Sequence, residues 1–214
     1  MFSYKTGWIQ IGFCWNSNNF SFKFNKGNQK IVDHYTYIMC GDGDLMEGVT
    51  AEAASLAGHL GLGKLICIYD DNKISIEGGT ELAFTENVAA RFRAYRWHVL
   101  QVTDGNDLAA IEKALKEARA ETAKPTLIAL RTHIAYGSPN KQDSHGAHGA
   151  PLGEEEIRLT KENFGWPANK KFYVPVEALK TFRRSIDKGK KAEASWQKKY
   201  KAYAKKYPEL ASEC

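Results

Sequence analysis

Short apolar segments of strand length alternate with amphipathic segments of helix length across residues 35–130 of this 214-residue chain. The apolar segments are nearly continuous, which indicates strands that are buried on both faces. Strand–helix alternation of this kind is typical of a parallel sheet with right-handed crossovers. We therefore predict an α/β fold, with an open, mostly parallel sheet and helices on both faces. Strands are expected at residues 35–40, 64–69, 98–102 and 126–130, and helices at residues 45–60, 86–96 and 106–122.

The chain divides into three predicted parts around this sheet. Residues 1–23 mix Asn, Ser and Gly with aromatic side chains, follow neither a helical nor a strand period, and stay unassigned. Residues 24–165 form the predicted α/β domain, which ends in a long loop at 133–153 and a helix at 154–163. Residues 166–214 are predicted to form a helical linker that leads away from the sheet.

The last part carries most of the positive charge. From residue 166 onward there are thirteen Lys and Arg against five Asp and Glu, whereas the whole chain has a formal net charge of +5. Trp196, Tyr200 and Tyr203 recur at helical spacing between lysines, which indicates an amphipathic helix with a solvated basic face. We expect no nucleic-acid binding, because no basic–aromatic sheet motif accompanies the charge. Helix breaks are expected near residues 188–189 and at Pro208.

Four cysteines lie far apart and form no Cys-x-x-Cys pair. Cys40 and Cys67 each lie in an apolar segment, where a cysteine usually behaves as a small buried hydrophobic residue. This pattern favours a reducing compartment, and we predict a cytoplasmic protein. The most apolar N-terminal stretch, residues 8–15, is too short to span a membrane, so no membrane association is expected.

Gly41, Asp42 and Gly43 stand where the first predicted strand ends and a helix begins. In open parallel sheets, ligands bind outside the carboxyl ends of the strands. Two glycines allow the close approach of an anion, and a helix N-terminus offers unpaired N–H groups. A carboxylate between them is compatible with a diphosphate only when a cation lies between the two groups. The triplet by itself is also a common turn.

Asp70, Asp71 and Asn72 end the next strand and therefore emerge at the same edge of the sheet as Asp42. Gly43 and Asn72 are separated by 28 residues, about the length of one strand–helix–strand crossover. Carboxylate, carboxamide and backbone carbonyl oxygens, together with diphosphate oxygens and water, would complete an octahedral Mg²⁺ site. A polar turn at the strand end is the alternative, and the spacing of an EF-hand is absent.

The sequence around these residues resembles transketolase. The spacing Gly-Asp-Gly-x28-Asn matches the thiamine-diphosphate motif of that family. The similarity runs from about Phe24 to the end of the chain, whereas residues 1–23 do not resemble the family. It implies the thiamine-diphosphate-binding fold in truncated form, with a linker toward a pyrimidine-binding domain that we expect this chain to lack. The segments that carry the resemblance are HYTYIMCGDGDLMEG (34–48), SLAGHLGLGKLICIYDDNKISIEG (55–78) and DSHGAHGAPLG (143–153).

The resemblance implies roles for individual residues, with thiamine diphosphate and Mg²⁺ as cofactors and Ca²⁺ or Mn²⁺ able to replace Mg²⁺. Asp42, Asn72 and the backbone carbonyl of Ile74 would be the metal ligands. His148 would contact the diphosphate and act catalytically, by donating a hydrogen bond or a proton to a substrate oxygen. The glycines would face the diphosphate, and two isoleucines would pack near the thiazolium ring. The implied cofactor contacts are Gly41, Asp42, Gly43, Asn72, Ile76, Ile134 and His148.

Other residues of the pattern keep more than one interpretation. Glu47 and Glu52 match acidic residues of the dimer interface in the family, which connect two active sites, although by themselves both would be solvated positions on a helix. His145 and His148 also have the spacing of a zinc pair, but two histidines in a glycine-rich loop lack a third ligand. Ile74 and Ile76, without the resemblance, would be core or strand residues.

The implied activity is the transfer of a two-carbon ketol unit from a ketose phosphate to an aldose phosphate. Sugar phosphates are the implied substrates, and a homodimer or a complementary transketolase chain is the implied partner. The glutamate that activates the aminopyrimidine would belong to the missing domain, so the chain alone is expected to be inactive. The alternatives are another thiamine-diphosphate enzyme, such as dihydroxyacetone synthase or deoxyxylulose-phosphate synthase, and a non-catalytic interaction module that uses the basic helix.

Overall fold

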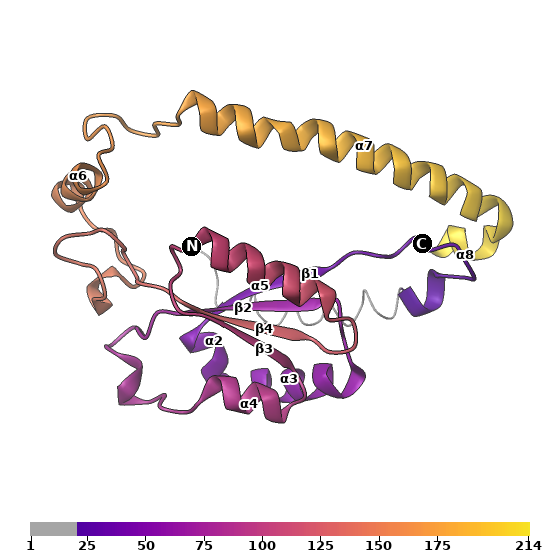
Figure 1. Ribbon diagram of the computed structural model, residues 1–214, viewed down its shortest axis with the longest axis horizontal. Helices are drawn as coiled ribbons and strands as arrows, with labels where there is room; N and C mark the ends of the chain where they lie inside the picture. Colours follow the sequence, from indigo (N-terminus) through magenta and orange to yellow (C-terminus); the bar gives the residue numbers. More distant parts are fainter. Residues whose placement is uncertain (1–20) are drawn as a thin grey trace. The chain divides into compact units, whose positions relative to one another are not determined.

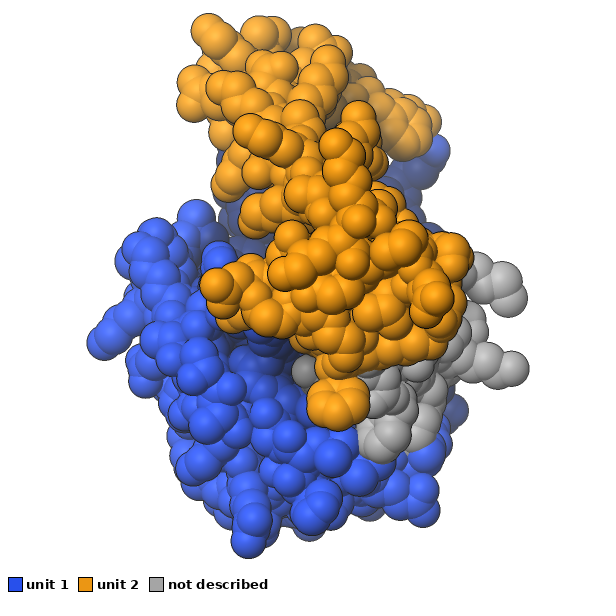
Figure 2. All heavy atoms as spheres, turned by 90° about the vertical axis from the view of Figure 1, so that its right-hand side faces the viewer, with its two compact units in different colours: residues 1–15, 34–168 blue, residues 16–33, 169–214 orange. Residues whose placement is uncertain are grey.

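The computed structural model describes residues 21–214. They form two compact units, coloured separately in Figure 2. The sheet unit comprises residues 34–168, and the helical unit comprises residues 21–33 together with residues 169–214. The unassigned segment 1–23 lies outside the described residues except for its last three. The domain boundaries given above stay a prediction.

The sheet unit contains a four-stranded parallel sheet with the strand order β1-β2-β4-β3. At the carboxyl ends, Gly41 of β1 pairs with Asp70 of β2, and Asp71 of β2 pairs with Arg131 of β4. The fourth strand in the sequence therefore lies beside the second. The predicted parallel sheet is confirmed, and its strands are β1 (Thr36–Gly41), β2 (Leu65–Asp71), β3 (His98–Val102) and β4 (Thr126–Arg131).

Helices cover both faces of this sheet, as predicted: α5 lies on one face, and α2, α3 and α4 lie on the other (Figure 1). The single helix predicted at residues 45–60 is wrong in its first turns. The backbone of Glu47 is extended (φ −64°, ψ 129°) and divides the segment into two helices. The helices are α2 (Asp42–Met46), α3 (Gly48–Leu60), α4 (Val88–Ala94) and α5 (Leu108–Ala120).

Local side-chain chemistry sets several of these helix ends. The Asn87 side chain accepts a hydrogen bond from the Ala90 N–H at 2.9 Å at the start of α4. Asp107 accepts from two N–H groups in the same way at the start of α5. Such caps satisfy donors that a helix N-terminus otherwise leaves unpaired. At the other end of α3, Gly61 adopts a left-handed conformation (φ 61°), which glycine allows without strain.

Successive strand residues point to opposite faces and so build two cores. Leu65 and Cys67 belong to the core that faces α3 and α4. Ile66 and Ile128 belong to the core beneath α5. Cys40 and Cys67 are free, buried cysteines whose Sγ atoms lie 3.4 Å apart, so their predicted burial is confirmed. Strands covered on both faces explain why the sequence shows continuous rather than alternating apolar residues.

The loop predicted at residues 133–153 contains only a short 3₁₀ turn, η2 (His145–Ala147), and is followed by α6 (Glu154–Asn163) as predicted. The Glu156 side chain holds the first half of this loop. It accepts hydrogen bonds from the Ser138 hydroxyl and from the Asn140 N–H at 2.8 Å. These bonds hold the pKa of Glu156 below its usual value.

The helical unit has a small aromatic core. Phe24, Ile31 and Tyr203 are its buried residues. Trp196 stacks on Tyr200 with ring centroids 5.1 Å apart, and its Nε1–H donates to the Ile31 carbonyl at 2.8 Å. The aromatic residues predicted to share one helix face therefore do form the packed face. Two helices of this unit are α7 (Val176–Lys206) and α8 (Pro208–Glu213), and residues 21–24 are also helical.

The two predicted breaks in the linker have different outcomes. The break near residues 188–189 is wrong, because α7 continues through Gly189 as one 31-residue helix. A glycine inside a helix costs about 1 kcal/mol relative to alanine, which a helix of this length absorbs. The break at Pro208 is confirmed, since α7 ends before it and α8 begins there. Within residues 21–214, none of the helices has the length and apolar character needed to cross a membrane.

Candidate functional site

The carboxyl ends of β1, β2 and β4 border a cavity of about 680 Å³ in the sheet unit. All of the residues predicted from the sequence as metal or cofactor contacts line this cavity, although they come from separate segments. The predicted interface residues Glu47 and Glu52 do not line it, and both are exposed. The predicted residues that line the cavity are Gly41, Asp42, Gly43, Asn72, Ile74, Ile76, Ile134 and His148.

Asp42 is the first residue of α2, and only 3% of its surface is exposed. The Tyr69 hydroxyl donates to its Oδ1 at 2.5 Å, and the Lys73 backbone N–H donates to its Oδ2 at 3.1 Å. Burial raises the pKa of the Asp42 carboxyl, and the two donors oppose that rise. An ionised carboxylate accepts about four hydrogen bonds, so two donors leave lone pairs for a further partner.

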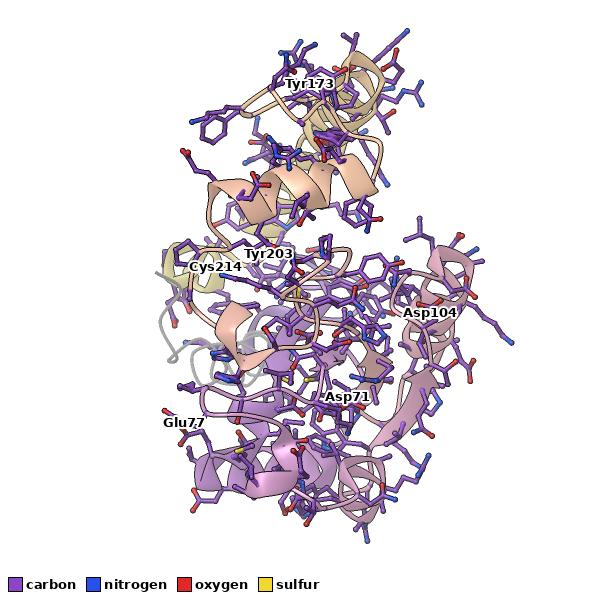
Figure 3. The ribbon with its side chains drawn as sticks, turned by 90° about the vertical axis from the view of Figure 1, so that its left-hand side faces the viewer. Asp71, Glu77, Asp104, Tyr173, Tyr203 and Cys214 are labelled. Carbon is purple, nitrogen blue, oxygen red and sulfur yellow. The ribbon has the colours of Figure 1, made fainter. Side chains whose placement is uncertain are left out.

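The Tyr69 hydroxyl lies between two carboxylates. Its ring is buried, and its oxygen contacts Asp71 Oδ1 at 3.1 Å in addition to Asp42. The Lys73 ammonium lies 2.7 Å from the same Asp71 oxygen. Burial and the adjacent carboxylates raise the pKa of Tyr69, so its hydroxyl keeps its proton and remains a donor. In Figure 3, Asp71 lies near the sheet, and Glu77 lies farther out on the loop that follows β2.

The Asn72 side chain is oriented by Asp70. Its Nδ2 donates to Asp70 Oδ2 at 3.2 Å, and the Thr132 hydroxyl donates to Asp70 Oδ1. Thr132 directly follows β4, so Asp70 connects the ends of β2 and β4. Asn72 Oδ1 accepts from the Ile74 N–H at 2.9 Å and, as a carbonyl oxygen, keeps a second lone pair. This oxygen is the candidate ligand.

Ile74 lies at the centre of an isolated antiparallel bridge. The hydrogen bonds of this bridge belong to its neighbours: the Thr80 N–H donates to the Lys73 carbonyl at 3.0 Å, and the Ser75 N–H donates to the Gly78 carbonyl at 2.7 Å. Neither bond uses the Ile74 carbonyl. These two bonds leave the Ile74 carbonyl oxygen unused, and Ile74 lines the cavity.

Gly41 and Gly43 leave room in the cavity wall. A Cβ atom on either residue would meet no atom within 4 Å, so open space adjoins both. The sequence suggested that N–H groups at this helix N-terminus would be free to bind an anion. The Gly41 N–H, however, donates to Asp44 Oδ2 at 2.8 Å and is therefore not free. The contribution of Gly41 is therefore space rather than a hydrogen-bond donor.

The histidines of the long loop are placed differently. His148 lines the cavity, whereas His145 begins η2 and does not line it. His133 also lines the cavity, and its Nδ1 lies 2.8 Å from Asp143 Oδ2. In the part of the chain that the structure describes, no group of three His, Cys, Asp or Glu side chains is placed to hold a metal ion. The candidate cation site depends instead on Asp42 with amide and backbone oxygens.

Sequence reasoning assigned no individual role to four residues of this region, Tyr69, Asp70, Thr132 and His133, although it placed Asp70 at the end of the strand. The first two come shortly before Asn72 in the segment Tyr-Asp-Asp-Asn, so polar side chains near a predicted ligand were a usable signal. The other two follow β4, and their position depends on the pairing of β4 with β2. The sequence carries no local signal for that pairing.

The sequence matches the family described as "Transketolase, thiamine diphosphate binding domain" over residues 8–214. The chain belongs to the transketolase family. The match begins at residue 8, so the similarity to transketolase starts earlier in the chain than the predicted start at about Phe24. The recognition of this family from the sequence is confirmed.

Several transketolases are similar to this chain. A transketolase of Nostoc sp. is 56% identical over 192 residues, which are 89% of this chain and 28% of that protein. A transketolase of Geobacillus stearothermophilus is 50% identical over 206 residues, which are 96% of this chain and 31% of that protein. The chain therefore spans less than a third of the length of these curated relatives.

Solved structures show the same fold. A Pichia stipitis transketolase in complex with sedoheptulose 7-phosphate matches with a TM-score of 0.90 and 45% identity, over 95% of this chain and 30% of that one. A Campylobacter jejuni transketolase matches with a TM-score of 0.85 and 42% identity, over 92% of this chain and 30% of that one. The thiamine-diphosphate-binding α/β fold predicted from the sequence is thus confirmed.

Proposed function

We propose that this chain supplies the Mg²⁺ and diphosphate part of a thiamine-diphosphate site in a transketolase. The observation that carries the proposal is the convergence of Asp42, Asn72 and Ile74 on one cavity at the carboxyl edge of a parallel sheet. Asp42 is buried, and its two hydrogen-bond donors are neutral groups. A buried carboxylate in that environment gains most from a bound cation.

The chemistry of the donor set supports Mg²⁺, with Ca²⁺ or Mn²⁺ as substitutes. Carboxylate, carboxamide and backbone carbonyl oxygens are hard ligands, which these cations prefer, whereas zinc prefers nitrogen and sulfur. The open space beside Gly41 and Gly43 would accommodate a diphosphate. Ile76 and Ile134 would supply apolar cavity wall for the thiazolium ring.

The proposed reaction is ketol transfer from a ketose phosphate to an aldose phosphate. Thiamine diphosphate supplies the nucleophilic carbon and the electron sink of this chemistry, and the protein supplies binding and orientation. His148 is the proposed catalytic residue, which donates a hydrogen bond or a proton to a substrate oxygen from the cavity wall. Because the chain covers less than a third of its relatives, turnover is proposed for the assembled enzyme.

Assembly with a second chain is part of the proposal, as a homodimer or with a complementary transketolase chain. Among the described strands β1 is at the edge of the sheet, and Met39 on it is 71% exposed. Exposed strand edges and apolar surface favour association. Glu47 and Glu52 are exposed and available for such an interface. A monodisperse monomer by light scattering at micromolar concentration would contradict this part.

The buried thiols of the chain support the proposal of a cytoplasmic location.

A thermal-shift titration with MgCl₂ and thiamine diphosphate, separately and together, tests the site. Ligand at 100 times its dissociation constant stabilises a folded protein by about 2.7 kcal/mol. We expect a rise in melting temperature that requires both compounds and disappears in Asp42→Ala. The matched control is Asp104→Ala, since Asp104 follows β3, does not line the cavity, and lies away from Asp71 in Figure 3.

The outcomes of this titration separate the hypotheses. If the rise in melting temperature is unchanged in Asp42→Ala, or is absent in the unaltered chain, the proposed site is contradicted. The remaining hypothesis is then the non-catalytic interaction module. A rise in melting temperature that is lost in Asp42→Ala and kept in Asp104→Ala supports the proposed site.

Ketol transfer is tested by mixing the chain with a separately expressed pyrimidine-binding chain and assaying xylulose 5-phosphate with ribose 5-phosphate. Normal turnover by this chain alone would contradict the expectation that it needs a partner.

A further inference from the structure

The packing of the Tyr69 side chain in the core fixes the position of its hydroxyl group. Its ring is only 2% exposed and belongs to the core that also contains Cys40 and Cys67. Since a close-packed core holds side chains in single rotamers, the oxygen at the ring tip has little freedom to move. Tyr69 lies near the carboxyl end of β2, directly before Asp70, which lines the cavity.

That fixed oxygen holds one side of the Asp42 carboxylate. Oδ1 receives the Tyr69 hydroxyl at 2.5 Å, and Oδ2 receives the Lys73 N–H at 3.1 Å. With one donor on each oxygen, rotation of the carboxylate about its Cβ–Cγ bond would break both hydrogen bonds. The plane of the carboxylate is therefore defined, and Asp42 lines the cavity with the lone pairs that remain.

The single hydroxyl proton of Tyr69 has two acceptors nearby and serves one at a time. Asp71 Oδ1 lies farther away, at 3.1 Å, and it has a positive partner of its own, the Lys73 ammonium at 2.7 Å. A carboxylate paired with an ammonium depends less on a second donor. The proton of Tyr69 is thus directed to Asp42.

We propose that Tyr69 is a positioning residue for the divalent cation: it orients the Asp42 carboxylate before the cation binds, without touching the cation itself. The inference rests on the proposed cation site. Residues that hydrogen-bond to a metal ligand fix its orientation, and their loss typically lowers metal affinity by about 10–100-fold. Tyr69 has this relation to Asp42.

The test is a Mn²⁺ titration of the full 214-residue chain, followed by the electron paramagnetic resonance signal of free Mn²⁺, with and without thiamine diphosphate. Tyr69→Phe removes the hydroxyl and keeps the ring. We expect about 10–100-fold weaker Mn²⁺ binding. The matched control is Tyr35→Phe, because the Tyr35 hydroxyl donates to the Arg119 carbonyl at 3.1 Å and does not line the cavity. That variant should bind as the unaltered chain does.

A purely structural role of Tyr69 predicts different results. Circular dichroism and the metal-free melting curve report whether Tyr69→Phe is folded, and the titration is repeated in an excluded osmolyte, which favours the compact state. The line shape of bound Mn²⁺ reports the symmetry of its ligands, which a loss of stability alone does not change. We expect broader lines in Tyr69→Phe than in Tyr35→Phe.

Mn²⁺ affinity of folded Tyr69→Phe within twofold of the unaltered chain would overturn the positioning role. If Asp42→Ala abolishes binding while Tyr69→Phe does not, the cation site stands and only the role of Tyr69 fails. If the unaltered chain does not bind Mn²⁺, or Asp42→Ala binds it equally well, the proposed function itself fails and the positioning role fails with it.

Discussion

Two buried tyrosines show how the two units of this protein differ. Tyr69 in the sheet unit is 2% exposed, and Tyr203 in the helical unit is fully buried. The Tyr69 hydroxyl contacts two carboxylates, whereas the Tyr203 hydroxyl has no hydrogen-bond partner among residues 21–214. The same side chain thus organises a polar site in one unit and only fills space in the other.

The cores around these tyrosines differ in size and in origin. The sheet unit buries residues from successive strands and helices in two cores on the two faces of the sheet. The helical unit buries three residues, and its Trp196–Ile31 hydrogen bond joins positions 165 residues apart. A small core depends on each of its members more strongly, because few other contacts replace a lost one.

We therefore expect the largest loss of stability from a core substitution in the helical unit. Tyr203→Ala removes the central side chain of its core, and large aromatic-to-alanine changes in a core cost about 3–5 kcal/mol. Hydrogen–deuterium exchange over residues 200–213 should accelerate accordingly. The control is Phe182→Ala on the same helix, since Phe182 is 77% exposed. Equal exchange in both variants would show that Tyr203 is not central.

The next effect concerns the sheet unit. Tyr69→Phe removes a donor from the buried Asp42 carboxylate, and hydrogen bonds to charged groups contribute about 1.5–3 kcal/mol. We expect the metal-free chain to lose that much stability in urea denaturation at pH 7. An unchanged midpoint would mean that another donor replaces the hydroxyl.

The corresponding substitution of tyrosine by phenylalanine in the helical unit should raise stability instead of lowering it. Tyr203→Phe removes a buried hydroxyl without a described partner, so no hydrogen bond is lost and an unfavourable desolvation is relieved. We expect a gain of about 1 kcal/mol, measured by slower exchange over residues 200–213. Destabilisation by Tyr203→Phe would contradict the contrast between the two tyrosines.

The smallest effect concerns pH and belongs to the sheet unit. Hydrogen bonds from Ser138 and Asn140 lower the pKa of Glu156, so this carboxylate contributes stability above its unfolded pKa and loses it as the pH falls through the lower folded value. Glu156→Gln should reduce the melting temperature slightly at pH 7 and flatten its fall between pH 5 and pH 3. Melting curves of both chains across this range give the comparison. Parallel curves would contradict it.

The elements of the sheet could be predicted because their signals are local. Strand positions followed from continuous apolar runs, and the cap of α5 follows from Asp107. Where prediction failed, the local signal was either outweighed by its context or absent. Gly189 suggests a helix end, but the helix on both sides propagates through it. The division between α2 and α3 at Glu47 had no local signal, since glutamate is a good helix former.

In the candidate site, too, some residues could be predicted from local signals in the sequence and others could not. Asp42 and Asn72 could be predicted because each follows a strand, and the ends of parallel strands joined by one crossover share an edge of the sheet. The resemblance to transketolase added Ile74, Ile134 and His148. The structure brings all five to one cavity, and their roles stay predictions.

By itself, the sequence determined that the chain forms a parallel α/β sheet of the transketolase family and that acidic and amide groups gather at its carboxyl edge. Only the tertiary structure decided that β4 lies between β2 and β3, which places Thr132 beside Asp70 and moves Asp104 away. It also decided that the Tyr69 hydroxyl meets Asp42. Periodicity and turn chemistry are properties of neighbouring residues, whereas strand order and side-chain contacts follow from how distant apolar faces pack together.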